Sequence, residues 1–410
     1  MPSLREAHLQ HTTYYLSVLS AVNELYLQGS DSAMQALTQF DREWANVQAG
    51  HRWTISNDAE DEVAALCDAY PDAGAFVLNL RQNPQDRIAW LEIALDAARR
   101  LNRRASECAH LDNLGFAHRH IGQLQVAMNY YNQSLVISRE IDDRHGEGAI
   151  LNNLGNAFAA LGQPQRAIKH HEQALAIRHE LNDPRGEAIT LANLGLAYNT
   201  LGQYEKAIRY HKQALAISHE IGDLQGEGAD LGNLALAYDN LRKSERAIEY
   251  YHQALTVVRK IGDRQGEGAL LGNLGLAYHN AGQPKHAIAS YQEALQVSRE
   301  IGDLQSESRH LGNLGLAYDK LGEHERAVDF YERRLIMARE IGDRRGEACT
   351  SWNLGLIYER KGNLARAIEL MRIMVEFERE IGHPDVEADS AHVNVLCARL
   401  AEKEESENSV

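Results

Sequence analysis

The chain repeats itself every forty residues. The octapeptide LGNLGLAY begins at Leu271 and again at Leu311, and a related stretch, SWNLGLIY, begins at Ser351. Close variants begin at four earlier positions in the same register: Leu111, Leu151, Leu191 and Leu231. Seven copies in one register predict a solenoid, in which each unit packs against its neighbours instead of contributing to one central core.

Each copy contains the pattern of two amphipathic helices. In the copy that starts at Leu304, an apolar stripe runs along the first helix through Leu311, Leu314 and Tyr318. Gly315 lies inside this stripe, where the missing side chain lets another helix approach closely. A second stripe, on a helix ending near Ile341, comprises Ala327, Tyr331, Leu335 and Ala338.

The junctions between copies carry helix-ending and helix-starting residues. The position after each second helix holds a residue that tolerates left-handed backbone: Asp142, Asn182, Gly222, Gly262, Gly302, Gly342 and Gly382. The next position is an aspartate, typical of a helix N-cap, in all copies except the last, which has His383: Asp143, Asp183, Asp223, Asp263, Asp303 and Asp343. The prolines fit this phase, so that we expect none inside a helix.

The pattern L-x-x-L-G-x-x-Y followed by A-x-x-x-Y resembles the tetratricopeptide repeat signature. Each unit has six residues more than this signature, and the junction between units has the pattern GDxxGE. In both features the chain is similar to the forty-residue subclass found in spindle-orientation adaptors and in bacterial signalling proteins. The resemblance implies an all-α fold: a right-handed superhelical solenoid of antiparallel helix pairs, with helical caps at both ends.

We expect five parts along the chain. A helical region (1–57) with helices near 3–28 and 32–50 precedes a degenerate repeat (58–103), and seven units (104–383) lead to a capping helix (384–402) and a disordered tail (403–410). The stretch QFDREWANVQAGHRW (39–53) resembles the helical region before the repeats of bacterial nucleotide-switch ATPases of the STAND or NB-ARC type. Since no GxxxxGK[ST] motif occurs, this resemblance implies a sensor arm without its nucleotide-binding domain.

Composition narrows the classes of partner. With 42 basic and 58 acidic residues the net charge is −16, which disfavours nucleic acid and anionic membranes. The four cysteines are scattered without a CxxC motif, and no stretch approaches the roughly 18 apolar residues of a membrane span. We therefore expect a reduced, cytoplasmic protein.

One asparagine recurs in every copy, and we call this set the asparagine ladder: Asn113, Asn153, Asn193, Asn233, Asn273, Asn313 and Asn353. It falls on the face of the first helix opposite the apolar stripe, a face that lines the concave groove in the family that the chain resembles. Primary amides both donate and accept hydrogen bonds, so a row of them suits the backbone of an extended peptide. The alternative is that these amides bond to the adjacent helix and fix the spacing between repeats.

Neighbouring positions suggest the character of the partner. An apolar leucine rail accompanies the ladder: Leu196, Leu236, Leu276, Leu316 and Leu356. Gly232, Gly272 and Gly312 are expected to leave space for a ligand. The groove charges are expected at Asp239, Arg309, Lys320 and Arg360. We therefore predict a protein or peptide segment with hydrophobic anchors, acidic where it meets the basic residues; the alternative is that the next repeat covers the leucines.

Catalytic and metal-binding patterns are not found in the sequence. The 19 histidines include no HExxH motif or set with metal-ligand spacing, and no cofactor is expected. The recurrent glutamates at the starts of first helices suit the helix dipole better than acid–base catalysis. Three hypotheses remain: a peptide-binding adaptor, a sensor arm acting on an attached or separate signalling ATPase, and a self-associating structural spacer.

Overall fold

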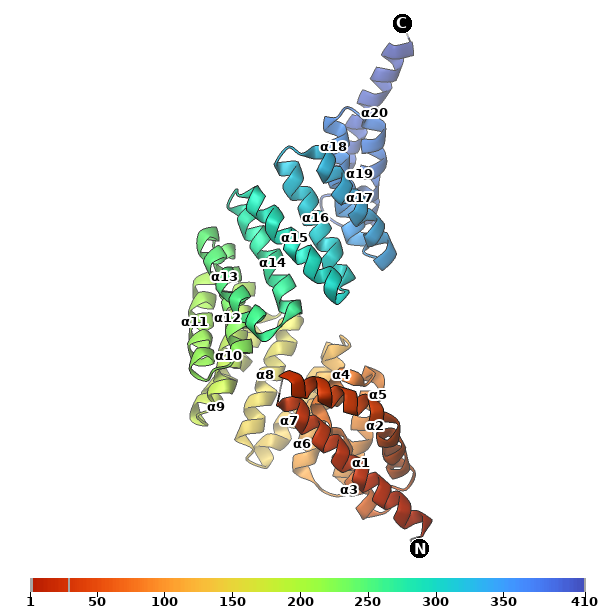
Figure 1. The fold of residues 1–410 in the computed structure, drawn as a ribbon, viewed down its shortest axis with the longest axis vertical. Coiled ribbons are helices and arrows are strands. Elements are labelled where there is room, and N and C mark those ends of the chain that lie inside the picture. The colour runs from red at the N-terminus through yellow and green to blue at the C-terminus, as the bar shows by residue number, and fades with distance from the viewer. Residues whose placement is uncertain (1–2, 29, 409–410) are drawn as a thin grey trace. The chain divides into compact units, whose positions relative to one another are not determined.

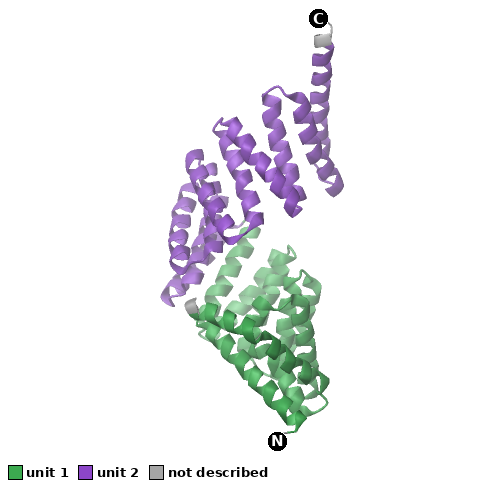
Figure 2. Cartoon of the chain, turned by 45° about the vertical axis from the view of Figure 1, so that its right-hand side comes forward, with its two compact units in different colours: residues 1–202 green, residues 203–410 purple. Residues whose placement is uncertain are grey.

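The computed structural model describes residues 3–28 and 30–408. These residues form twenty helices and no strand, so the predicted all-α class is confirmed (Figure 1). The chain divides into two compact units, residues 1–202 and 203–410 (Figure 2). Each unit is described by itself.

Unit 1 begins with a long antiparallel pair, α1 (Leu4–Leu27) and α2 (Ser30–Ser56). The helix α2 continues six residues beyond its predicted end. Two shorter helices follow, α3 (Asp61–Ala73) and α4 (Ala75–Arg81), and α3 packs on α5 (Pro84–Arg100). Together α1 to α4 enclose a separate core built on residues such as Leu19, Phe40 and Tyr70.

The remaining helices are regular pairs. In unit 1 they are α6 (Arg104–His120), α7 (Leu124–Glu140), α8 (Arg144–Ala160), α9 (Pro164–Glu180) and α10 (Pro184–Thr200). In unit 2 they are α11 (Tyr204–Glu220), α12 (Leu224–Asn240), α13 (Ser244–Ile261), α14 (Arg264–Asn280), α15 (Pro284–Ile301), α16 (Leu304–Lys320), α17 (His324–Ile341), α18 (Arg344–Arg360), α19 (Leu364–Ile381) and the terminal α20 (Val386–Asn408). Even-numbered helices from α6 to α18 are the first helices of their repeats.

The predicted junction chemistry is present. Gly302 has φ 72° and follows the end of α15, while Asp303 accepts a hydrogen bond from the backbone N–H of Ser306 at 3.0 Å. Asp142 and Asn182 adopt the left-handed conformation as well, with φ 57° and 50°. The residues chosen for these positions therefore end one helix and start the next, as the sequence predicts.

The glycine inside the first-helix stripe is explained by packing. A Cβ on Gly315 would lie 2.6 Å from the ring of Tyr331, and that tyrosine is fully buried. Gly275 accommodates Tyr291 in the same way. The close approach of the two helices thus places one aromatic ring over each glycine.

Two expectations about the ends of elements are wrong. Pro71 lies inside α3, where its carbonyl accepts a hydrogen bond from Arg87. The helix ends two residues later, at Ala73. The tail predicted to be disordered is helical as far as Asn408, since its glutamates and lysine favour helix. Residues 409 and 410 lie outside the described residues.

The repeated glutamates form a charged clasp at the junctions. Glu267 is buried; it accepts a hydrogen bond from Arg259 Nε at 2.6 Å, and it also pairs with Arg264. The same arginine–glutamate pairing occurs at Glu107, Glu147, Glu307 and Glu347. At Glu187 and Glu227 the arginine is replaced by His179 and His219. Sequence analysis predicted only a favourable charge at a helix start, and the ion pairs add a link to the preceding helix.

Within each unit, successive first helices contact one another: α6 with α8 and α8 with α10 in unit 1, and α12, α14, α16 and α18 in sequence in unit 2. The faces on which the asparagine ladder lies are therefore next to each other from one repeat to the next. This arrangement positions the candidate site.

Candidate functional site

A hollow of about 290 Å³ lies between the first helices α12 and α14. It brings together three predicted site residues, Asn233, Leu236 and Asn273. The end of α13 closes one side with Val258 and Ile261. The hollow is therefore an apolar-walled depression with carboxamides from two successive repeats.

Members of the asparagine ladder have two different environments. Asn153 donates to the carboxylate of Asp112 at 3.0 Å, and Asn193 donates to the side-chain oxygen of Asn152 at 3.0 Å. Both bonds join neighbouring first helices, which is the structural alternative that the sequence left open. These two amides hold the repeats together.

Farther along, the ladder loses this bond. Among the described residues, no side-chain hydrogen bond holds Asn233, Asn273 or Asn313. The position that would supply the acceptor for Asn273 and Asn313 is occupied by Gly232 and Gly272. Of these three amides, Asn273 is exposed and the other two are half-buried. Asn113 and Asn353 are also half-buried, and a binding role for the ladder stays a prediction.

The leucine rail is partly open. Leu196, Leu276 and Leu316 are 40%, 45% and 42% exposed, so each presents apolar surface to solvent. Leu236 and Leu356 are half-buried, and Leu356 packs against the core cluster between α19 and α20. The rail is therefore most accessible at Leu196, Leu276 and Leu316.

The expected ligand space over two glycines is filled. Gly272 and Gly312 are buried, and a Cβ on Gly272 would lie 2.6 Å from the ring of His310. Arg334 occupies the space over Gly312. The expectation is wrong at both positions because neighbouring helices use the missing side chain for their own packing. Gly232 lines the hollow, but a Cβ there would lie 2.9 Å from Leu270 Cδ2, so the space directly over it is partly taken as well.

Of the predicted groove charges, two are engaged by side chains of a neighbouring repeat and the other two are exposed at the surface. Asp239 is buried and accepts hydrogen bonds from Ser244 and Asn280, both at 3.2 Å, so it does not present a charge to the groove as expected. Arg360 pairs with Asp319 of the preceding first helix at 2.5 Å. Arg309 is exposed and donates to Ser306 on its own helix.

Lys320, the last of the four predicted charges, is exposed at the end of α16. Of the three predicted basic residues, Arg309 and Lys320 form no ion pair with another repeat in the described part of the chain.

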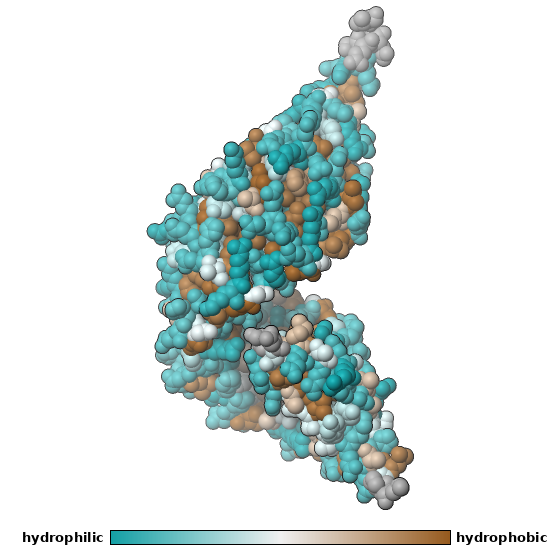
Figure 3. All heavy atoms as spheres, in the orientation of Figure 1, coloured by the Kyte–Doolittle hydropathy of each residue, from teal (hydrophilic) through white to brown (hydrophobic). Residues whose placement is uncertain are grey.

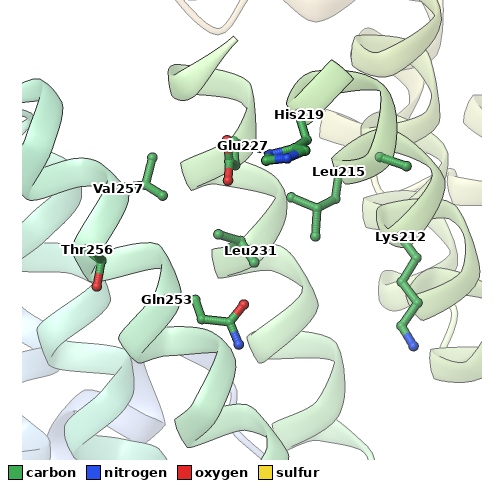
Figure 4. Close-up of a pocket in the computed structure, with 9 residues that line it drawn as sticks. Lys212, Leu215, His219, Glu227, Leu231, Gln253, Thr256 and Val257 are labelled. Atoms are coloured by element: carbon green, nitrogen blue, oxygen red, sulfur yellow. Dashed lines mark ion pairs between the residues drawn. The ribbon is translucent and has the colours of Figure 1, made fainter. Parts of the chain in front are cut away.

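A second depression lies on the other side of α12, between the second helices α11 and α13. It encloses about 520 Å³. Figure 4 shows Leu231 of α12 between Leu215 and Val257, with Lys212 and Gln253 nearby and an ion pair between His219 and Glu227. Sequence analysis did not single out this surface, although Leu231 and Glu227 belong to the repeated pattern. Small side chains at Ala216 and Thr256 also line it.

Several histidines belong to the core. His171, His211 and His310 are buried, and burial lowers the pKa of each to about 4, so they are neutral near pH 7. His171 fills the space over Gly155, as tyrosine does in other repeats. These three histidines therefore contribute to packing.

One group of possible metal-ligating atoms, Glu378, His383 and Asp385, comes together among the described residues, although the sequence suggested none. Its contacts are ion pairs of 3.5 and 3.8 Å around His383. Glu378 is buried and Asp385 is exposed, and exposed acidic groups are common without an ion.

The face of the chain in Figure 3 is mostly hydrophilic, with hydrophobic side chains gathered in small patches. Within the described residues, no helix is both long enough and apolar enough to cross a membrane.

Solved structures similar to this chain share its fold. The signal transduction ATPase with numerous domains (STAND) that has a tetratricopeptide repeat sensor, from Pyrococcus horikoshii, aligns with 94% of this chain at 17% identity and a TM-score of 0.63. The alignment covers 59% of that protein. The apo quorum sensor NprR from B. thuringiensis aligns with 90% of this chain and 97% of its own, at 15% identity and a TM-score of 0.52.

A Rap protein complexed with competence and sporulation factor aligns with 84% of this chain and 99% of its own, at 17% identity and a TM-score of 0.50. A search of curated proteins finds no match. The sequence profile of the tetratricopeptide repeat matches residues 146–220, 228–300, 267–340 and 306–372. These matches cover more than half of the chain, which therefore belongs to the tetratricopeptide repeat family.

Proposed function

We propose that this protein is a non-enzymatic scaffold that binds an extended protein or peptide segment along its first helices. The observation that carries the proposal is the hollow between α12 and α14, where Asn233 and Asn273 have no side-chain hydrogen bond to the described part of the chain. An amide at such a place can donate to a peptide carbonyl and accept from a peptide N–H.

Exposed leucines supply the apolar part of the contact. Leu276 and Leu316 lie on the two first helices after α12 and are more than two-fifths exposed. A partner with hydrophobic side chains at intervals would bury them, while Asn273 and Asn313 hold its backbone. Arg309 and Lys320 favour an acidic residue at that end of the segment.

The test uses selection from a phage-displayed library of random linear peptides. We expect selected peptides to carry apolar anchors with an acidic residue toward one end, and to bind the parent protein. Replacing Asn233 and Asn273 together by alanine should weaken this binding by about tenfold or more, because two hydrogen bonds to the peptide backbone are lost. Stability should change by no more than about 0.5 kcal/mol, since neither amide is bonded within the protein.

A matched control is offered by Asn153 and Asn193. Replacing them by alanine removes both bonds and strands Asp112, whereas Asn152 keeps its 2.9 Å contact with His171, so we expect a loss of stability of about 1–3 kcal/mol. Selection of no peptide, or unchanged binding by the Asn233/Asn273 variant, would refute the proposal. A large loss of stability in that variant would assign all four amides to the scaffold.

A second candidate is a ligand-sensing arm that acts on an attached or separate STAND-type ATPase. The fold likeness to the Pyrococcus horikoshii protein supports it, because the alignment extends over 94% of this chain and so reaches beyond the repeats. Co-purification with a P-loop ATPase, changed by a selected peptide, is the expected result. Co-purification that the peptide leaves unchanged would argue for the adaptor alone.

A further inference from the structure

A small pocket in unit 1 lies outside the surfaces described above. It encloses about 220 Å³ between α4, α5 and α6. Leu80, Pro84 and Phe116 form apolar walls, and Leu80 is 56% exposed. The volume is below the roughly 300 Å³ at which sites for drug-sized ligands begin, so it suits a single residue or a fragment of that size.

An incompletely bonded arginine lines this pocket. Arg87 is only 3% exposed. Its Nε donates to Asn79 Oδ1 and its Nη2 to the carbonyl of Pro71, both at 3.2 Å. Its Nη1 has no hydrogen-bond partner among the described residues. Burial lowers the pKa of this guanidinium to about 10, with Asp72 acting in the opposite direction, so it remains charged near pH 7.

A buried amide lies in the same pocket lining. Gln82 is 8% exposed, and within the described chain neither its Nε2 nor its Oε1 has a partner. Leaving such groups unbonded in the interior costs free energy, and a buried guanidinium costs more. Two unsatisfied polar side chains on one apolar-walled pocket therefore indicate a ligand that would bond to both.

We infer that this pocket binds a carboxylate attached to a small apolar group. A carboxylate accepts hydrogen bonds with both oxygens, so it can satisfy Nη1 of Arg87 and the amide N–H of Gln82 together. The apolar part would contact Leu80, Pro84 and Phe116. A monoanion fits better than a phosphate dianion, because the pocket supplies one guanidinium and Asp72 opposes further negative charge.

Such a group occurs in two sources, a free apolar amino acid and the C-terminal residue of a peptide. The test is titration calorimetry of the full chain with N-acetyl-leucine, free leucine and N-acetyl-leucinamide, together with saturation-transfer NMR for weak binding. We expect the amide to bind at least about tenfold more weakly than a carboxylate. Preference for N-acetyl-leucine assigns the pocket to a peptide terminus, and preference for leucine assigns it to a free amino acid.

The variant Arg87→Met should weaken carboxylate binding by at least about tenfold. Gln82→Leu, which leaves the arginine in place, gives a second measurement if Arg87→Met folds poorly. The matched control is Arg81→Met, because Arg81 is an exposed arginine on α4 that pairs with Asp41 and does not line the pocket. Its affinity should equal that of the parent.

Three results would overturn the inference. They are equal binding of N-acetyl-leucinamide and N-acetyl-leucine, an affinity unchanged by both Arg87→Met and Gln82→Leu, and no binding of either N-acetyl-leucine or free leucine. The result is independent of the proposed groove function. The Asn233/Asn273 variant leaves this pocket intact, so loss of peptide selection and loss of carboxylate binding can be told apart.

Discussion

The charged clasp at the repeat junctions can be tested by comparing two glutamates at the same repeat position. Glu267 is 4% exposed, with Arg259 Nε at 2.6 Å and Arg264 also paired to it. Among the described residues Glu227 has one ion-pair partner, His219, at 3.5 Å; the glutamate side chain is 18% exposed and the histidine side chain 78%. The two sites therefore differ in burial and in the number of charged donors.

The perturbation is glutamate to glutamine at each site, which keeps the shape of the side chain and removes its charge. Glutamine has one acceptor oxygen, so at Glu267 one of two charge-assisted hydrogen bonds is lost and an amide N–H faces a guanidinium. We expect a loss of stability of about 2 kcal/mol there, within the usual range of about 1.5–3 kcal/mol for a bond to a charged group. At Glu227 the change should be about 0.5 kcal/mol or less, because its single partner, His219, is largely exposed to solvent.

The assay is urea unfolding followed by circular dichroism, together with hydrogen exchange in α14 and α12. A local loss of about 2 kcal/mol corresponds to about thirtyfold faster exchange of the amides at the start of α14. Glu227→Gln should leave exchange in α12 within about threefold of the parent. Equal effects of the two substitutions would refute the reasoning, because they would show that the arginine partners add nothing to the junction.

Two further outcomes are expected in unit 2. Gly315→Ala should lower stability by about 1–3 kcal/mol in thermal or urea melts, because its Cβ would clash with the buried ring of Tyr331; a stabilised variant would contradict this packing. Burial lowers the pKa of His310 to about 4, so the unfolded chain binds more protons between pH 6.5 and 4 and this histidine reduces stability as pH falls through that window. His310→Leu should therefore gain about 2 kcal/mol relative to the parent between pH 7.5 and 5, and an equal stability difference at both pH values would contradict the assignment. The pH dependence of the parent alone would not isolate His310. Burial raises the pKa of Asp230 to about 7, so Asp230 stabilises the folded chain as pH falls, and this contribution cancels when the variant is compared with the parent.

Local chemistry was readable from the sequence. The left-handed residue and the capping aspartate lie next to each other in the chain, so the ends of the helices could be predicted from residue type alone, as at Gly302 and Asp303. The close approach at Gly315 followed from the same kind of local pattern. Such features depend on the geometry of a single repeat.

Contacts between repeats could not be predicted in the same way. Asp239 was expected in the groove, but its carboxylate accepts from Asn280, which lies one repeat and one residue later. Whether two such side chains meet depends on the offset between neighbouring first helices. The pocket around Arg87 was missed for a related reason: it is built by α4, α5 and α6, and α4 belongs to the part of the chain where the regular spacing fails.

The asparagine ladder shows how one repeated residue can take different roles. Its amide is held at Asn153 and Asn193, where Asp112 and Asn152 of the preceding first helix supply an oxygen. At Gly232 that oxygen is missing, and Asn273 lies exposed beside a hollow. A single change in the preceding copy therefore turns a bond between repeats into a group available to a partner. Because Gly272 repeats this situation for Asn313, and Leu276 and Leu316 are exposed on the same helices, the physical case for peptide binding is strongest on α12, α14 and α16.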